Sequence, residues 1–161
     1  MSRHGRGATE RETVSRRVLR GFSPDQLIEL RKRKGWTVTD AARVADVTTR
    51  TLRNWEAGEV SPQIDLLRRL LSELGGSVSD VVQIPEENRF PGDWRVLRAL
   101  TQPELGRKAG VSTATIGAVE RGEIRLSDPV AKAIAQALDV PVDEYRTSHE
   151  RARRRPPGTP A

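Results

Sequence analysis

The chain has 161 residues, of which 35% are apolar and 31% are charged, and its formal net charge at pH 7 is +6. It contains no cysteine, which excludes disulfides, cysteine-based zinc sites and thiol nucleophiles. The first residues are polar and lack an apolar signal core, and no apolar run approaches the ~20 residues of a membrane span. We therefore expect a cytoplasmic protein without a membrane partner.

The excess positive charge is concentrated at the two ends of the chain. Residues 1–22 contain six arginines and two glutamates, and residues 146–161 contain five arginines and one glutamate. Neither end shows apolar periodicity, so we expect a basic arm over 1–22, disordered or partly helical, and a basic, proline-rich disordered tail over 147–161. These ends could add phosphate contacts without sequence preference, or serve only as solvated tails.

Residues 23–84 predict a small helical domain. Ser23 is a good N-cap for a first helix, and Thr37 and Thr48 each precede a further short helix. A fourth helix is predicted within residues 61–76, where apolar residues recur at helical spacing, and a short fifth piece follows it. No segment shows the sustained alternation of a strand, so we expect an all-α domain.

The same pattern occurs again 64 residues downstream. The stretch VTTRTLRNWEAGE at 47–59 is matched by VSTATIGAVERGE at 111–123, and the offset holds without a gap over more than fifty residues. A single shared amphipathic helix would not produce such an extended match. We therefore expect a second, duplicated domain over 92–146 and a linker over 85–91.

Within each copy, only three or four residues join the second and third helices. The connections are ADVT in copy one and AGVS in copy two. This spacing is typical of a helix-turn-helix, whose second helix can lie in the major groove of DNA. Gly110 can adopt a left-handed conformation freely, and Asp46 can do so at a modest cost. Ala42 and Gly106 are small enough to let the two helices approach closely.

The segments LRKRKGWTVTDAARVADVTTRTLRNWEAGEVSP and WRVLRALTQPELGRKAGVSTATIGAVERGE both resemble the Cro and lambda-repressor (xenobiotic response element) family of bacterial and phage regulators. The resemblance implies two five-helix domains in tandem that bind duplex DNA as a transcription regulator, which we expect to be nucleoid-associated. The residues themselves show no catalytic cluster, so we expect no enzymatic activity and no cofactor. The resemblance also implies that an arginine of the first helix pairs with a glutamate that ends the third. The matching pairs are Arg31 with Glu56 and Arg95 with Glu120.

The resemblance places the base-contacting positions of copy one on Thr49, Arg50 and Asn54, with Arg53 beside them. Arginine can bind guanine O6 and N7, and asparagine can bind adenine N6 and N7. The set is therefore competent to read bases. The alternative is that the two arginines form only a solvated helix face.

Copy two presents a different surface, made by Thr113, Ala114, Gly117 and Ala118. It offers methyl groups and one hydroxyl, but no bidentate group. The resemblance marks Gln102, which follows the capping threonine, as a frequent DNA contact. A glycine inside a helix costs ~1 kcal/mol relative to alanine, so we expect another group to pack closely at Gly117.

Further candidate DNA contacts lie at the starts of the second and third helices, where free N–H groups favour phosphate. Those that begin a helix are equally explained as N-caps. These candidates are Thr37, Thr48, Thr101, Ser112 and Thr115. Arg43, on the outer surface of the second helix of copy one, is a secondary candidate.

These observations predict a sequence-specific, duplex-DNA-binding transcription regulator in which copy one reads bases. Copy two would contact phosphate or mediate self-association. A single chain could address two successive grooves, or a homodimer could address a palindrome. The alternative is an interaction protein, such as an adaptor or an antitoxin-like partner, in which copy two docks a protein.

Overall fold

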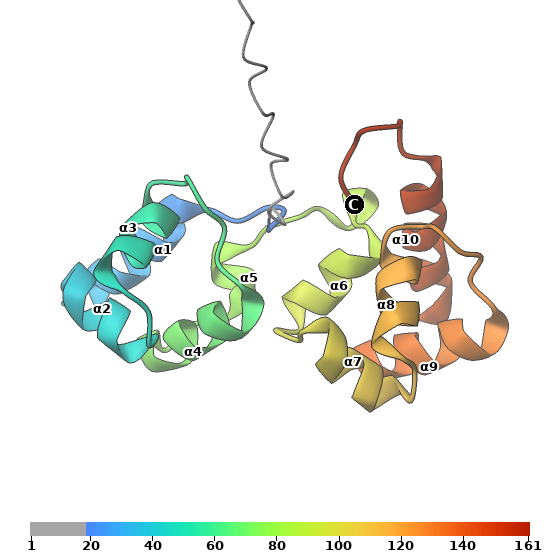
Figure 1. The fold of residues 1–161 in the computed structure, drawn as a ribbon, viewed down its shortest axis with the longest axis horizontal. Helices are drawn as coiled ribbons and strands as arrows, with labels where there is room; N and C mark the ends of the chain where they lie inside the picture. The colour runs from blue at the N-terminus through green and yellow to red at the C-terminus, as the bar shows by residue number, and fades with distance from the viewer. Residues whose placement is uncertain (1–18) are drawn as a thin grey trace, which may run out of the picture.

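The computed structural model describes residues 19–161. Within that range the regular structure is helical, apart from one isolated antiparallel β-bridge between Phe22 and Val82, so the all-α prediction is confirmed. The helices form two bundles, domain 1 and domain 2, which lie side by side in Figure 1. None of the described helices is long and apolar enough to cross a membrane.

Hydroxyl caps set the helix starts of domain 1. The side chains of Ser23, Thr37 and Thr48 each accept a hydrogen bond from the backbone N–H three residues further on, which satisfies a donor that the helix itself leaves free. The helices of domain 1 are α1 (Pro24–Arg33), α2 (Val38–Val44), α3 (Thr49–Glu56), α4 (Ile64–Leu74) and α5 (Val78–Val81).

Domain 2 uses the same caps. Thr101 and Ser112 accept hydrogen bonds from the amides of Glu104 and Thr115, and the Glu104 carboxylate accepts one from the Thr101 amide in return. A short 3-10 helix, η1 (Glu86–Asn88), precedes this domain. Its helices are α6 (Pro91–Leu97), α7 (Gln102–Ala109), α8 (Thr113–Glu120), α9 (Asp128–Leu138) and α10 (Val142–Arg154).

The backbones of the two domains repeat at the predicted offset. Helices α3 and α8 begin and end 64 residues apart, and so do α4 and α9. Left-handed backbone positions repeat as well, with φ between 54° and 74° at each. The corresponding pairs are Gly35 and Ala99, Asp46 and Gly110, Gly58 and Gly122, and Gly75 and Asp139. Ala99 adopts this conformation although it costs an alanine ~1–2 kcal/mol, so the tertiary fold imposes the turn.

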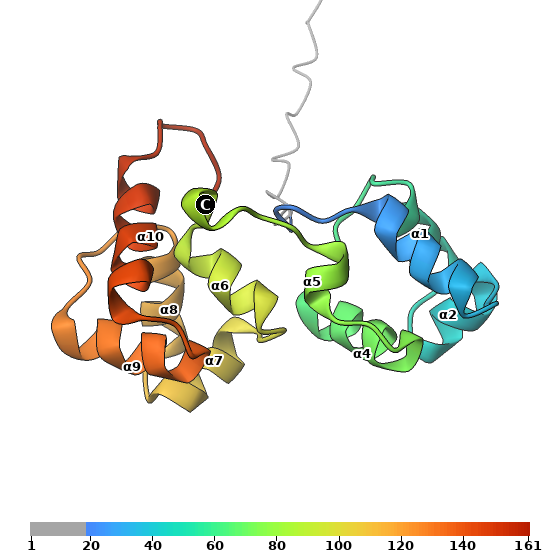
Figure 2. The same cartoon turned by 180° about the vertical axis from the view of Figure 1, so that it is seen from behind.

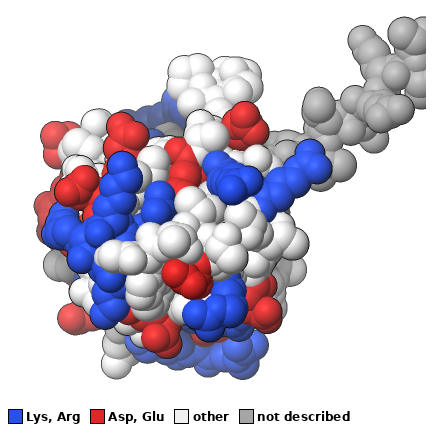
Figure 3. Space-filling model, turned by 90° about the vertical axis from the view of Figure 1, so that its left-hand side faces the viewer, with Lys and Arg blue, Asp and Glu red and all other residues white. Residues whose placement is uncertain are grey.

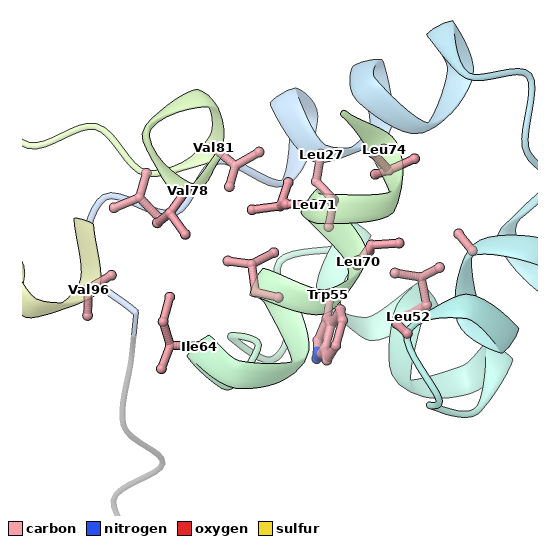
Figure 4. Packing of buried hydrophobic residues seen from close by; sticks show 14 of the residues in the cluster. Leu27, Leu52, Trp55, Ile64, Leu70, Leu71, Leu74, Val78, Val81 and Val96 are labelled. Carbon is pink, nitrogen blue, oxygen red and sulfur yellow. The ribbon is translucent and has the colours of Figure 1, made fainter. Parts of the chain in front are cut away.

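Each domain encloses its own apolar core. In domain 1, Leu52 and Trp55 of α3 lie beside Leu70 of α4, as Figure 4 shows. In domain 2, Ile116 of α8 packs with Tyr145 of α10, and both side chains are fully buried. Burying a large apolar side chain contributes roughly 1.5–3 kcal/mol, so these contacts fix one face of each third helix against its bundle.

Domain 2 contacts domain 1 through its first helix. Val96 of α6 belongs to the domain 1 core (Figure 4). Leu97 and Ala99 pack against that core from outside. Arg68 of α4 reaches across in the other direction, with Nη1 2.7 Å from the Ala99 carbonyl oxygen and 2.9 Å from Glu104 Oε2. Apolar packing and an ion pair therefore both restrict the relative position of the two domains.

The connection between the domains is shorter than predicted. Helix α6 begins at Pro91, inside the expected linker over 85–91, and η1 occupies part of the remainder. Arg20, from before α1, pairs with the buried Asp93 of α6 and lies 4.1 Å from the centroid of the Phe90 ring. The segment before domain 1 therefore also contacts domain 2.

The predicted arm over 1–22 requires a correction at its end. Residues 1–18 lie outside the described part of the chain. Gly21, however, accepts a hydrogen bond from the Gln83 amide at 3.1 Å, and Ser23 donates one to the Val81 carbonyl at 2.7 Å. Residues 19–22 therefore pair with the end of α5 and belong to domain 1.

The prediction of a disordered tail over 147–161 is wrong for residues 147–154. Helix α10 continues to Arg154 and buries Ser148, His149 and Ala152 against domain 2. Two of these inward residues are polar and the third is small, so the segment carries no apolar stripe that would reveal a helix. Residues 147–154 are helical because they pack against the α8–α9 turn. The sequence does not reveal this packing.

Acidification should destabilise domain 2 through His149. Burial lowers the pKa of this imidazole, so the unfolded chain binds a proton at higher pH than the folded chain does. The stability contributed by neutral His149 is present above its unfolded pKa, about 6.5, and is lost as the pH falls through its lower folded pKa. We expect the urea concentration at the unfolding midpoint to be lower at about pH 5 than at about pH 7. In the His149→Gln variant this difference between the two pH values should be smaller. Equal pH dependence in the variant and the wild type would contradict this.

Candidate nucleic-acid interface

Helix α3 has one buried face and one polar face. Leu52 and Trp55 are buried in the core, and the predicted contacts occupy other positions of the helix. Arg50 and Arg53 are exposed, while Thr49 and Asn54 are half-buried beside them. The guanidinium groups of both arginines have no hydrogen-bond or ion-pair partner among residues 19–161, so the protein leaves these donors available.

Other parts of the domain 1 surface carry charges of both signs. Arg43 of α2 lies 3.8 Å from Asp40, and Arg69 of α4 lies 3.6 Å from Asp46, with both pairs on the surface. Figure 3 faces the domain 1 end of the molecule and shows Lys and Arg interspersed with Asp and Glu. The predicted contact Arg43 therefore carries a partly neutralised charge, and this face presents no large field of one sign.

The turns between the paired helices have the expected left-handed residue. Asp46 and Gly110 occupy it with φ of 55° and 70°. The amides that follow, those of Val47 and Val111, donate to carbonyl groups five residues earlier at 3.0 and 2.9 Å. Both valines are half-buried against their cores, so each turn is anchored from inside.

The α7–α8 turn is packed more tightly than an alanine would allow. A Cβ atom on Gly106 would lie 2.6 Å from the Val111 carbonyl oxygen and 3.5 Å from the Thr113 amide nitrogen. Domain 1 has Ala42 at the corresponding position, with its side chain buried. The turn before α8 therefore brings its two helices too close together for a side chain at Gly106, whereas the turn before α3 accommodates the methyl group of Ala42.

In domain 1, an ion pair ties the first helix to the end of α3. Arg31 Nε donates to Glu56 Oε1 at 2.7 Å, and Arg31 Nη1 donates to the Trp36 carbonyl oxygen at 2.9 Å. The two charged side chains are only 14% and 8% exposed. Removing one partner of such a buried pair typically costs about 3–5 kcal/mol, so the pair supports the structure and is not available for ligands.

The equivalent pair in domain 2 has an additional partner. Arg95 Nε donates to Glu120 Oε1 at 2.5 Å, and Arg95 Nη1 donates to the Leu100 carbonyl oxygen at 2.8 Å. Gln102 Nε2 donates to Glu120 Oε2 at 2.9 Å. The structure thus places the side chain of Gln102, predicted to contact DNA, against the buried ion pair.

The predicted hydroxyl contacts cap helices in the structure. Thr37, Thr48 and Ser112 are exposed caps, while Thr101 is half-buried. Ser112 Oγ also donates to Thr115 Oγ1 at 2.8 Å, so Thr115 is occupied within its own helix start. The three exposed caps remain accessible to a ligand that approaches the start of α2, α3 or α8.

The surface of α8 lacks long side chains at its base-reading positions. Thr113 and Ala114 are exposed and Ala118 is half-buried. A Cβ atom on Gly117 would lie 2.9 Å from Arg121 Nη1, so Arg121 is the group that packs at this glycine. Sequence reasoning predicted such a neighbour without naming it. The sequence could have identified it by spacing, because Arg121 lies four residues, about one helical turn, after Gly117.

A further charge lies close to this arginine. Glu123 accepts hydrogen bonds from Arg121 Nε at 2.6 Å and from Arg121 Nη2 at 3.2 Å. The Arg121 hydrogen bond lowers the pKa of the Glu123 carboxyl, which keeps it ionised at neutral pH. The described residues contain no group of three or more His, Cys, Asp or Glu side chains that could hold a metal ion.

Comparison with known families agrees with this geometry. A family model described as helix-turn-helix matches the chain twice, over residues 27–81 and 93–145. Each match runs from the first helix of a bundle into its last helix. No curated protein matches the chain.

Replacing Gly106 with alanine should destabilise domain 2. Gly→Ala inside a helix normally stabilises it by up to ~1 kcal/mol, but the new methyl group would collide with the Val111 carbonyl oxygen. We expect the free energy of unfolding to fall by about 1–3 kcal/mol, measured by urea denaturation. An unchanged or higher stability would show that the α7–α8 turn widens to the domain 1 geometry.

Proposed function

The chain belongs to the helix-turn-helix family whose model covers both of its domains, and on that premise we propose that it is a sequence-specific, duplex-DNA-binding transcription regulator. In this proposal α3 of domain 1 reads base edges in the major groove. Domain 2 assists by contacting the DNA backbone. The two domains therefore divide recognition between them.

The exposed arginines of α3 carry this proposal. Arg50 and Arg53 are free of partners among the described residues, and Asn54 lies on the same face. A guanidinium group can donate two hydrogen bonds to guanine, and a carboxamide can pair with adenine. Helix α8 offers no equivalent groups, which favours α3 as the reader.

The arrangement of the domains supports binding by one chain to one duplex. Helices α3 and α8 lie in front of α1 and α10 in Figure 1, and behind them in the reverse view of Figure 2. Both third helices are therefore on the same side of the molecule. The Arg68 contacts to domain 2 restrict the distance between them.

The alternative function, docking of a protein through domain 2, has less support on the surface. Ile124 is the one large apolar side chain that is exposed in the described part of the chain, at 40%. Ala114 and Ala118 add only methyl groups. An apolar docking site normally requires a contiguous exposed patch, which these residues do not make.

Selection of bound fragments from a random duplex pool tests the proposed function directly. Recovery of a motif would support it, and two blocks one helical turn, about 34 Å, apart would indicate that two recognition helices read DNA. A palindromic motif would assign the blocks to two chains. Failure to enrich any motif at moderate salt would overturn the proposal and favour a protein partner.

Arg50→Ala should weaken binding to the selected site by about 5- to 150-fold and relax preference at one or two base pairs. The physical reason is the loss of a bidentate contact to a base. Lys132→Ala is the matched control, because it removes one exposed positive charge from α9 instead. Fluorescence anisotropy with selected and scrambled duplexes would measure both. Equal losses on the two duplexes would show that Arg50 contacts phosphate and does not read a base.

A further inference from the structure

A hollow of about 630 Å³ lies where the chain passes from domain 1 to domain 2. Its walls come from Arg20 before α1, from Asn88 and Phe90 of the connection, and from α10 with the residues that follow it. In Figures 1 and 2 the chain end after α10 returns to the connection between the domains, so Pro156 and Thr159 form one wall. Small-molecule sites typically measure about 300–1,000 Å³ and occur preferentially between domains. Both the size and the position of the hollow therefore suit a ligand.

The lining of this hollow is predominantly positive. It contains four guanidinium groups, those of Arg20, Arg151, Arg154 and Arg155. Glu150 is the one carboxylate of the lining, and it lies 3.3 Å from Arg154. Arg20 pairs with Asp93, which lies outside the lining. The other two arginines donate hydrogen bonds only to carbonyl oxygens among residues 19–161. The hollow therefore retains uncompensated positive charge, which attracts an anion.

Hydrogen bonds from one part of each guanidinium hold these arginines in place. Arg151 Nη1 donates to the Arg89 carbonyl oxygen, and Arg155 Nε donates to the Thr159 carbonyl oxygen at 2.8 Å. The Nη2 groups of Arg20, Arg151 and Arg155 have no hydrogen-bond partner within the described part of the chain. Because a guanidinium carries five N–H donors, each side chain is positioned by some donors and leaves others available to a ligand.

The hollow also has apolar and neutral walls. The ring of Phe90 lies 4.1 Å from the guanidinium carbon of Arg20, measured to the ring centroid. Pro156 adds a second apolar surface, and Asn88 supplies a side-chain amide. Small-molecule sites combine apolar walls of this kind with a few placed charged groups. The lining therefore suits a compact molecule that carries acidic groups.

The chain segment that precedes the hollow does not supply such an anion. Residues 1–18 contain five arginines and two glutamates, so this segment is itself basic. None of the lining residues belongs to α3 or α8, so the hollow lies outside the surface proposed to read bases. We therefore look for the complementary charge in a separate small molecule.

We propose that this hollow, which we call the junction site, binds a small molecule carrying at least two phosphate or carboxylate groups. Guanidinium groups bind both kinds of oxyanion with paired N–H donors, so the chemistry that the two share is that of a compact polyanion. At least two acidic groups are needed, because Arg20 and Arg151 come from different walls of the hollow. The junction site adds a ligand to the proposed function and does not depend on DNA binding.

A ligand in the junction site would link the two domains. Residues 19–22 pair with the end of α5, so Arg20 is attached to domain 1, whereas Arg151 and Arg154 belong to α10 of domain 2. A molecule that binds both sets of arginines therefore favours the domain arrangement in which they line one hollow. A ligand that binds only the folded chain also raises its thermal midpoint, by roughly 5–10 °C at 100 times its Kd.

Isothermal titration calorimetry and thermal unfolding of the full chain test the junction site. The probes are pyrophosphate and citrate, and sodium chloride at matched ionic strength corrects for general salt effects. We expect saturable one-to-one binding of at least one probe, with a matching rise in the thermal midpoint. Binding of pyrophosphate alone would identify the ligand as a phosphate compound, and binding of citrate alone would identify it as a polycarboxylate.

Variants of the lining locate the bound probe. Arg151→Gln combined with Arg154→Gln should weaken binding by at least about 10-fold, because charge-assisted hydrogen bonds are lost. Glu150→Gln should strengthen binding, since it removes the one carboxylate of the lining. The matched control, Arg153→Gln with Lys132→Gln, removes the same charge from exposed positions outside the lining, one of them on the same helix. Arg154→Gln alone keeps the test if the double variant does not fold, because the Arg154 side chain is 82% exposed.

The outcomes separate this site from the proposed function. Absence of saturable binding of both probes to the folded wild type would overturn the junction site, and so would equal weakening in the double variant and its control. Displacement of the probe by duplex DNA, with a matching loss of DNA affinity in the double variant, would assign the hollow to the DNA backbone and overturn the small-molecule site. Normal probe binding without enrichment of any DNA motif would support the junction site and overturn the proposed function.

Discussion

The buried arginine–glutamate pair is the interaction on which each domain depends. It joins the first helix to the last turn of the recognition helix, and the same arginine binds the carbonyl that precedes the second helix. Three elements are thus fixed by one guanidinium group. In domain 2 the pair also engages Gln102 and lies near Tyr145, whose pKa is raised first by burial and then by the charge of Glu120. A buried pair of this kind specifies one arrangement, because leaving either charge unpaired is costly.

With its backbone fixed in this way, the duplicated domain could exchange surface residues freely. Ala99 and Asp139 occupy left-handed positions that domain 1 fills with glycine, yet the helix ends on either side of these two turns fall at the same offset. The exposed residues diverged more widely. Domain 1 keeps polar side chains on its recognition helix, while domain 2 has small residues there and arginines beyond it. The internal ion pair is thus the same in both domains, whereas the exposed side chains of the two third helices differ.

The contact between the domains restricts the position of α3 relative to α8. Val96 contributes to the core of domain 1, and Arg68 binds two groups of domain 2. Hydrogen bonds from Thr101 and Arg68 lower the pKa of Glu104 despite the opposing effect of its partial burial, so the ion pair stays charged at neutral pH. A change at this interface would therefore alter how α3 and α8 are placed relative to one another.

The sequence by itself determined the duplication, the turns and the helices as far as residue 146, because caps, glycines and spacing are local signals that a constant offset reinforces. The partners of Arg31 and Arg95 followed from the family resemblance of those same segments. The sequence also indicated that a group packs at Gly117. Only the tertiary structure decided that Arg121 is this group, that Gln102 turns toward Glu120, and that residues 147–154 form a helix. These features depend on contacts between residues distant in the chain: Ser148, His149 and Ala152 carry no apolar pattern, and their burial exists only because the α8–α9 turn lies against them.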